Sequence, residues 1–204
     1  KLSGLTVSGY YAPVPEAAGL KVKQVLTVHD LIPLQFPKLH VKLFFIFWVQ
    51  LFLVSKKAST VIAGSECARL DWVNWGSRRF KGRSRLVHDG IDVPEDLHYE
   101  EEKLKVPETP FIMYVGDTRA YKRVDVLIQA LAKTNQLINL KVVGKVNETQ
   151  KKNLEAIASS CGVLERVIFC GFVDDNELHS LYRSAAAVGL ATEAEGFGLS
   201  LIHI

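Results

Sequence analysis

The second half of the chain alternates short apolar runs with segments of helical period. Continuous apolar runs of strand length, typical of strands covered on both faces, are FIMYV (111–115), NLKVVG (139–144), RVIFCGF (166–172) and AAVGLA (186–191). Two sets of apolar residues follow the spacing i, i+3, i+4, i+7 that predicts helices: Val124, Leu127, Ile128 and Leu131, then Leu178, Leu181, Tyr182 and Ala185. This alternation predicts a doubly wound parallel sheet with right-handed crossovers, whose ligands bind at the carboxyl ends of the strands.

Polar residues mark the starts of two helices in this half. Asp174 followed by Glu177 three residues later has the pattern of a capping box. Asn147 with Gln150 predicts another start, for a helix that stops near Gly162. Both helices are therefore expected to begin directly after a loop that leaves the predicted sheet.

The first half shows a weaker pattern of the same kind. Its predicted elements are strands at 25–28, 60–64 and 85–91 and helices near 43–57 and 66–75. Between the halves, residues 93–109 combine prolines with an acidic cluster, the composition of an exposed linker. We predict an α/β protein with two domains, 1–92 and 110–204, which both have fewer elements than a complete domain needs.

The most apolar stretch, LFFIFWVQLFLV (43–54), is shorter than the roughly 20 residues of a membrane span. We expect a buried core helix, with a helix lying on a membrane as the alternative. The nearby basic residues form either a solvated face or, with this helix, a contact with anionic lipid: Arg78, Arg79, Lys81, Arg83 and Arg85. Nucleic-acid binding is disfavoured, because Phe80 is the only aromatic residue between them.

Composition indicates a folded globular protein with a small charge balance. The 204 residues are 48% hydrophobic and 23% charged, and the net charge of +3 does not demand a nucleic-acid partner. Three cysteines without a C-x-x-C pair (Cys67, Cys161 and Cys170) favour a reducing compartment, and we expect the cytoplasm. The first ten residues lack the pattern of a signal peptide, and the missing initiator methionine suggests a piece of a longer protein.

Several familiar motifs are absent, and a candidate phosphate site remains. The chain has no G-x-G-x-x-G, no P-loop, no G-x-S-x-G and no zinc-spaced cluster, which disfavours dinucleotide oxidoreductases, P-loop kinases, serine hydrolases and zinc enzymes. Gly116 ends the strand 111–115, and Lys122 lies just before the next helix, flanked by Arg119 and Arg123. A cation beside a helix N-terminus suits a phosphate, although a solvated loop lysine has the same spacing.

A second candidate cluster follows the strand that ends near Leu190. It reads EAEGFG from Glu193 to Gly198. Glycines allow the backbone to approach a ligand closely, and a carboxylate can accept hydrogen bonds from sugar hydroxyls. A plain glycine turn is the alternative interpretation.

Five segments in register resemble a known family. They are TVHDLIPLQFP (27–37), VIAGSE (61–66), HDGID (88–92), YVGDTRAYK (114–122) and GFVDDNELHSLYRSAAAVGLATEAEGFGLS (171–200). Together they resemble retaining glycosyltransferases of family four, also called group 1, and are mannosyltransferase-like. The resemblance implies two Rossmann-like domains of the glycosyltransferase-B type and transfer of a hexose, with retention of configuration, from a nucleotide sugar to a glycan or lipid-linked acceptor.

The same resemblance implies a donor and a setting. The donor would be GDP-mannose or a UDP-sugar, used as substrate with no cofactor. No metal is expected, which agrees with the absence of an Asp-x-Asp motif. Polysaccharide biosynthesis follows from the resemblance. The apolar stretch 43–54 and the nearby basic residues are the reason to expect peripheral contact with anionic lipid at the inner, cytoplasmic face of a membrane, and no nucleic-acid partner is expected.

The resemblance assigns roles to individual residues. Lys122 matches the family's lysine on the donor diphosphate, while Asp117 stands where an arginine is usual, so that Arg119 would replace it. The loop Gly171–Val173 resembles the one lining the nucleobase pocket. The implied catalytic residues are Lys122, Glu195 and His29, and the implied donor-binding residues are Gly116, Arg119, Lys122, Val173, Glu195, Gly196, Phe197 and Gly198.

Glu195 and His29 would both face the transferred sugar. Glu195 matches the first glutamate of the family's paired glutamates, whereas a histidine hydrogen-bonded at a strand end remains the alternative for His29. The family continues with a proline and a second glutamate where this chain has Ser200 and His203. We therefore expect a piece of a larger enzyme, inactive alone, whose residues 200–204 are not native. A non-catalytic sugar-nucleotide-binding remnant and a sugar-nucleotide epimerase are the alternatives.

Overall fold

The computed structural model describes residues 9–13, 23–55, 58–76, 82–90, 107–134 and 137–196. These residues form two compact units. The first contains the described residues up to Gly90 together with Glu195 and Gly196, and the second runs from Pro107 to Ala194. Each unit is built on a four-stranded parallel sheet. This confirms the predicted α/β class.

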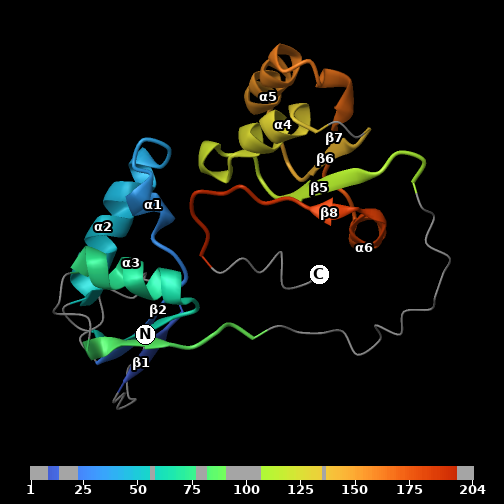
Figure 1. Ribbon diagram of the computed structural model, residues 1–204. Coiled ribbons are helices and arrows are strands. Elements are labelled where there is room, and N and C mark those ends of the chain that lie inside the picture. The colour runs from blue at the N-terminus through green and yellow to red at the C-terminus, as the bar shows by residue number, and fades with distance from the viewer. Residues whose placement is uncertain are drawn as a thin grey trace. The chain divides into compact units, whose positions relative to one another are not determined.

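The first unit has its strands in the order β1-β2-β3-β4. Its elements are β1 (Tyr10–Ala12), β2 (Gln24–Val28), α1 (Ile32–Gln35), α2 (Val41–Ser55), β3 (Ala58–Ala63), α3 (Glu66–Gly76) and β4 (Ser84–Leu86). The three helices lie together beside the strands (Figure 1). They share one core cluster, in which Leu26 and Val61 of the sheet pack with Leu51 of α2 and Trp72 of α3.

The second unit has the strand order β7-β6-β5-β8 and buries both faces of its sheet. Its elements are β5 (Phe111–Val115), α4 (Val124–Ala132), β6 (Asn139–Val143), α5 (Glu148–Ser160), β7 (Val167–Gly171), α6 (Asp175–Ser184) and β8 (Ala187–Val188). Helices α4 and α5 cover one face around Tyr114 and Leu140, and α6 covers the other around Met113 (Figure 1). Two short 3₁₀ helices, Ala120–Lys122 and Leu164–Arg166, lie in the connections.

Both predicted helix starts in this unit are confirmed. The Asp174 carboxylate accepts a hydrogen bond from the Glu177 backbone N–H, and the Asn147 side chain accepts one from that of Gln150, each at 2.8 Å. Each bond satisfies an N–H group that has no partner within its helix. Gly162, at φ +70°, follows the end of α5 in the left-handed conformation that glycine adopts readily.

The core-helix prediction for residues 43–54 is wrong. Leu51 is fully buried and Phe47 packs against the core, but most of the described apolar side chains of α2 are exposed. The reason is geometric, because α2 reaches the apolar cluster that the described residues of this unit form only along the stripe that contains Phe47 and Leu51. No described helix combines the length and the apolar character needed to cross a bilayer.

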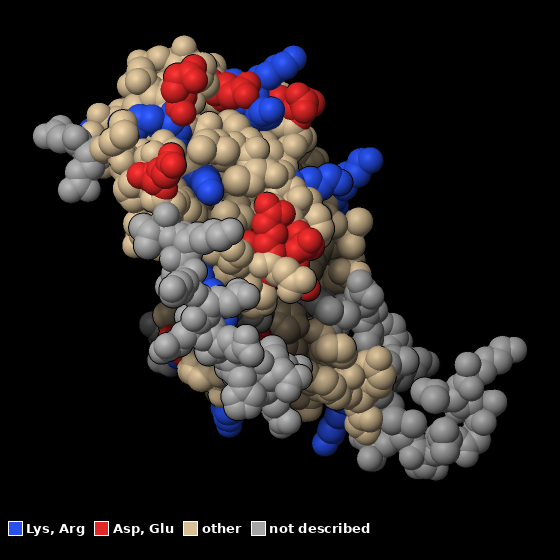
Figure 2. All heavy atoms as spheres, turned by 90° about the vertical axis from the view of Figure 1, so that its right-hand side faces the viewer, with Lys and Arg blue, Asp and Glu red and all other residues tan. Residues whose placement is uncertain are grey.

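The strand predicted at 85–91 is shorter than expected. β4 ends at Leu86 and pairs with β3 on one side. Two described members of the basic run bind backbone carbonyls close by, since Arg85 Nη1 donates to Ser84 O at 3.0 Å and Arg83 Nη1 to Ala58 O at 3.5 Å. Arg78, Arg79 and Lys81 lie outside the described residues. Acidic and basic side chains are interspersed on the described part of the face in Figure 2, in keeping with the small net charge.

Candidate functional site

Two glycines directly follow the neighbouring strands β5 and β6, and the first of them begins the loop between β5 and α4. Gly116 follows β5 at φ +142° and donates its N–H to Val143 O at 2.9 Å. Gly144 follows β6 at φ +129°, and a Cβ atom there would overlap the carbonyl oxygen of Gly116. The close approach of the two backbones therefore requires glycine at position 144. It fixes where the loop leaves the sheet.

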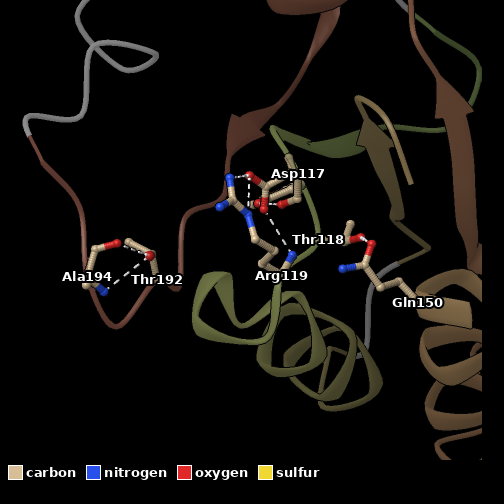
Figure 3. A network of polar contacts seen from close by, with 7 residues as sticks. Asp117, Thr118, Arg119, Gln150, Thr192 and Ala194 are labelled. Atoms are coloured by element: carbon tan, nitrogen blue, oxygen red, sulfur yellow. Dashed lines mark hydrogen bonds and ion pairs between the residues drawn. The ribbon is translucent and has the colours of Figure 1, made fainter. Parts of the chain in front are cut away.

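Asp117 and Arg119 pair within this loop (Figure 3). The Arg119 guanidinium reaches Asp117 Oδ2 at 2.5 Å (Nη2) and 2.9 Å (Nε), and the Arg119 backbone N–H donates to Asp117 Oδ1 at 3.0 Å. Burial raises the pKa of Asp117, but the hydrogen bonds and charge of Arg119 outweigh it and hold this pKa below its ordinary value. Asp117 is therefore ionised at neutral pH. Its negative charge partly neutralises the positive charge with which Arg119 would bind a phosphate.

Lys122 ends the 3₁₀ helix that precedes α4. Its N–H donates to Arg119 O at 2.8 Å, and its Nζ lies 5.3 Å from the ring centroid of Tyr121. Arg119 Cζ lies 5.5 Å from the same ring, which is 3% exposed. A buried ring attracts cations to its face. Tyr121 thus holds both predicted donor-binding cations close to the N-terminus of α4.

Arg123 connects the loop to the segment after β8. It lies at the start of α4 with φ +52°, a left-handed conformation that is uncommon for arginine. Its guanidinium reaches Asp125 Oδ1 and Oδ2 at 3.1 Å and Glu193 Oε1 at 2.5 Å. Asp125 and, after it, Glu193 raise the pKa of Arg123. This ion pair was not predicted, because no local spacing rule relates residues 70 positions apart.

Backbone contacts support the same connection. Glu193 N–H donates to Tyr121 O at 2.8 Å, and Thr192 Oγ1 lies 3.3 Å from the same oxygen. Thr192 Oγ1 donates to Ala194 O at 2.7 Å, which closes a tight turn (Figure 3). The segment that leads to Glu195 is therefore tied to the loop that carries Lys122.

Thr118 joins the loop to α5. Its hydroxyl donates to Gln150 Oε1 at 3.0 Å, and the residue is 7% exposed (Figure 3). Gln150 lies in the first turn of α5, whose N-terminal position is set by the Asn147 cap. The sequence analysis used Gln150 only as a helix-start signal and gave no sign of this contact, because a threonine in a loop has no characteristic spacing.

The loop after β7 presents an exposed aromatic ring. Gly171 turns the chain at φ +71°, and the following Phe172 is 88% exposed. Val173 packs against the cluster of Phe111 and Met113, so its side chain anchors the loop to the sheet. An exposed ring on an anchored loop can stack on a flat ligand.

In the first unit, three of the sequence motifs meet at the carboxyl ends of the strands. His29 follows β2, and its Nδ1 lies 3.7 Å from Asp89 Oδ2 in the HDG segment after β4. His88 Nδ1 lies 3.0 Å from the carbonyl oxygen of Gly64, which follows β3. A Cβ on Gly64 would come within 2.6 Å of Asp89 Oδ2. Asp89 is a neighbour of His29 that the sequence analysis missed.

Glu195 and Gly196 belong to this first unit. Ser65 Oγ donates to Gly196 O at 2.5 Å, and a Cβ on Gly196 would lie 3.0 Å from His29 O. Glu195 is half-buried. Phe197, Gly198, Ser200 and His203 lie outside the described residues.

The predicted site residues are thus divided between the two units. His29, Glu195 and Gly196 are in the first, and Gly116, Arg119, Lys122 and Val173 are in the second. Across the described ranges, no three His, Cys, Asp or Glu side chains gather in a way that would hold a metal ion.

Comparison with known proteins identifies the family. The family described as "Glycosyl transferases group 1" matches residues 97–203, about half of the chain. This chain belongs to the group 1 glycosyltransferases. A D-inositol 3-phosphate glycosyltransferase of Xylanimonas cellulosilytica is 36% identical to this group 1 chain over 130 residues, 57% of this chain and 31% of that protein. An uncharacterized glycosyltransferase of Methanocaldococcus jannaschii is 33% identical over 124 residues, 56% of this chain and 32% of that protein.

Solved structures place this group 1 chain in the glycosyltransferase-B fold. Anabaena Alr3699/HepE, in complex with UDP and glucose, aligns with a TM-score of 0.72 at 22% identity, over 96% of this chain and 56% of that one. Sucrose-phosphate synthase from Thermosynechococcus elongatus aligns with a TM-score of 0.71 at 20% identity, over 96% of this chain and 53% of that one. The group 1 chain therefore spans about a third of these curated relatives and about half of these solved structures.

Proposed function

We propose that this chain carries the donor site of a retaining glycosyltransferase that moves a hexose from a nucleotide sugar to a glycan or lipid-linked acceptor. The observation that carries the proposal is the loop at the carboxyl end of β5, where Lys122 and Arg119 both lie against the buried Tyr121 ring at the start of α4. Fixed cations and helix N–H groups are the protein's means of binding a diphosphate. Family membership supports the reaction class.

The chemistry follows from charge. Breaking the bond between the anomeric carbon and the diphosphate oxygen builds positive charge on the sugar and negative charge on the leaving group. Lys122 would stabilise the leaving diphosphate, since preorganised cations lower the barrier where charge develops. Glu195 would orient the sugar, and His29 would face it beside Asp89. The leaving phosphate would help to take the acceptor proton.

The donor is proposed as a UDP-sugar or GDP-mannose. The complexes of Alr3699/HepE with UDP and with UDP-glucose support uridine, while the sequence resemblance to mannosyltransferases supports guanosine. Phe172 and the backbone of Val173 would contact the base, and the backbones of Gly116 and Gly196 the diphosphate and the sugar. The proposal needs no metal and no further cofactor.

The setting is proposed as polysaccharide biosynthesis at the cytoplasmic face of a membrane, with peripheral contact to anionic lipid.

A second candidate, a sugar-nucleotide-binding remnant without activity, is favoured by one observation. Asp117 occupies the position of the family's second cation and pairs with Arg119, which reduces the positive charge available to the diphosphate. The two candidates agree on donor binding and differ in turnover.

Thermal-shift titration of this chain with UDP-glucose, UDP-N-acetylglucosamine and GDP-mannose tests the donor site, with NAD as the control ligand. A ligand that binds only the folded state raises the melting temperature. We expect one sugar nucleotide to raise it in the wild type and in Lys133→Ala, at the other end of α4, and not in Lys122→Ala. If no sugar nucleotide shifts a sample that circular dichroism shows to be folded, the donor site is overturned.

A further inference from the structure

Two buried hydroxyl groups hold the loop between β5 and α4. Tyr114, on β5, is 1% exposed, and its hydroxyl donates to the carbonyl oxygen of Asp117. Thr118 is 7% exposed, and its hydroxyl donates to Gln150 Oε1 on α5 at 3.0 Å (Figure 3). A buried hydroxyl destabilises the fold unless it has a hydrogen-bond partner, so each of these bonds restricts the position of the group that accepts it.

The two hydrogen bonds act on a single peptide unit. Tyr114 binds the carbonyl group of Asp117, and the N–H of the same peptide belongs to Thr118, whose side chain binds Gln150. Gln150 is itself fixed, because its backbone N–H donates to the Asn147 cap at 2.8 Å. The peptide between residues 117 and 118 is therefore held by β5 and by α5, two separate elements of the second unit.

This peptide comes directly before the cationic part of the loop. Arg119 follows it, and the carbonyl oxygen of Arg119 accepts the Lys122 N–H at 2.8 Å. Both cations lie against the ring of Tyr121. A change in the orientation of the peptide would be passed on to Arg119 and, through this hydrogen bond, to Lys122. Binding groups that must meet a ligand at hydrogen-bond distance lose much of their effect when they are displaced by about 1 Å.

Packing alone does not account for the two hydroxyls. The ring of Tyr114 belongs to the apolar cluster under α4 and α5, where a phenyl ring would make the same contacts. Valine at position 118 would fill nearly the same volume as threonine. Hydrogen bonds in the low dielectric of the interior instead specify one arrangement of the groups that they join. What the two hydroxyls add to the fold is the conformation of the loop.

We propose that Tyr114 and Thr118 are positioning residues of the donor site. Their hydroxyls hold the peptide between residues 117 and 118 so that Arg119 and Lys122 meet the diphosphate of the nucleotide sugar. This inference rests on the proposed function and adds to it two residues that do not touch the ligand. Because they act through the loop, their loss should affect the diphosphate more than the rest of the nucleotide.

Tyr114→Phe and Thr118→Val each remove one hydroxyl and keep the size of the side chain. UDP and GDP are titrated into the wild type by calorimetry, and the diphosphate that binds is compared with its monophosphate. We expect each variant to raise the Kd of the diphosphate about fivefold, the usual net effect of one hydrogen bond, and that of the monophosphate less. A hydroxyl with a purely structural role would change both Kd values equally.

Rescue and coupling test the Thr118–Gln150 bond separately. Thr118→Ser keeps the hydroxyl and should bind the diphosphate as the wild type does. Gln150→Met removes the acceptor and should weaken the diphosphate as much as Thr118→Val. The double variant should bind no more weakly than either single variant, because the two residues act through one hydrogen bond.

Matched controls remove hydroxyls of the second unit that lie away from the loop. Thr134→Val deletes a hydroxyl beyond the C-terminal end of α4, which donates to Leu131 O at 2.8 Å and accepts from Arg166 Nη2 at 2.9 Å. Tyr182→Phe deletes a hydroxyl on α6, which covers the other face of the sheet. Both controls should keep the affinity of the wild type, even where the melting temperature falls. Circular dichroism checks that every variant is folded.

Three results would overturn the proposal. The first is a diphosphate affinity that Tyr114→Phe and Thr118→Val both keep, the second is an equal loss for the diphosphate and the monophosphate, and the third is a loss of the same size in the controls. If Tyr114→Phe does not fold, Thr118→Val, Thr118→Ser and Gln150→Met still decide the role of Thr118. If neither UDP nor GDP binds the folded wild type, the proposed function fails and this inference fails with it, whereas wild-type binding that the variants keep overturns this inference alone.

Discussion

Arg123 and Glu193 form an ion pair at 2.5 Å across 70 positions of sequence. Arg123 starts α4 in a left-handed conformation directly after Lys122, and Glu193 lies two residues before Glu195. Within the second unit, the pair ties the segment after β8 to the loop that carries the proposed diphosphate ligand.

Glu193→Gln should weaken donor binding and lower the stability only slightly. The pair is partly exposed, and such pairs contribute up to about 1 kcal/mol to folding, so the melting temperature should change little. Loss of the Arg123–Glu193 ion pair should raise the Kd for the bound sugar nucleotide about fivefold, which corresponds to about 1 kcal/mol. Titration calorimetry measures the affinity.

The matched control for this variant is Glu155→Gln, which removes another partly exposed ion pair, Lys151–Glu155 at 3.9 Å on α5. This control should change neither the affinity nor the melting temperature appreciably. Equal donor affinity in Glu193→Gln and Glu155→Gln would show that the Arg123–Glu193 pair does not position the site.

Gly144→Ala should destabilise the second unit strongly. The new Cβ would overlap the Gly116 carbonyl oxygen, and the backbone is already at φ +129°. We expect a loss above about 2 kcal/mol, because steric overlap adds to backbone strain. Gly162→Ala is the control, since Gly162 also has positive φ but has no atom near its virtual Cβ, and strain alone should cost about 1 kcal/mol. Urea unfolding measures both values, and equal losses would contradict the steric argument.

Local signals made the fold of the second unit predictable. The caps Asn147 and Asp174 act within one helical turn, so their sequence pattern is enough to place α5 and α6. The exposure of α2 was not predictable in this way, because an apolar helix has the same sequence whether or not another layer covers it. Helix α1 was missed because four residues are too few to show helical periodicity.

Within the candidate site, glycines and cations were identified individually and their contacts were not. Arg119 was expected to replace a missing cation, yet its guanidinium pairs with the carboxylate of Asp117, two residues away. The partners Gln150, Glu193 and Asp89 come from elements far along the chain, and only the folded topology brings them to Thr118, Arg123 and His29. Contacts of this kind need the sheet order, which the sequence pattern does not specify.

Asp117 should make stability depend on pH in the acid range. Its folded pKa is depressed, so ionised Asp117 contributes stability that is present above the unfolded carboxyl pKa and is lost as the pH falls through the lower, folded pKa. Asp117→Asn should therefore melt below the wild type at neutral pH, and this difference should shrink as the pH falls below about 4. Melting curves across the acid range measure it. A difference that is constant with pH would show that the Arg119 pair does not act through the charge of Asp117.

Lys122→Ala should abolish most of the turnover in an enzyme extended to the length of its relatives. Lys122 is held beside Tyr121 and next to the start of α4, where it would meet the negative charge that develops on the leaving diphosphate. Removing one such stabilising group costs about 10²-fold or more in rate. Release of UDP or GDP, measured with saturating donor, gives the rate, and Lys133→Ala should match the wild type. A near-wild-type rate in Lys122→Ala would remove this residue from the site. Donor binding with no turnover in the wild type would favour the remnant over the transferase.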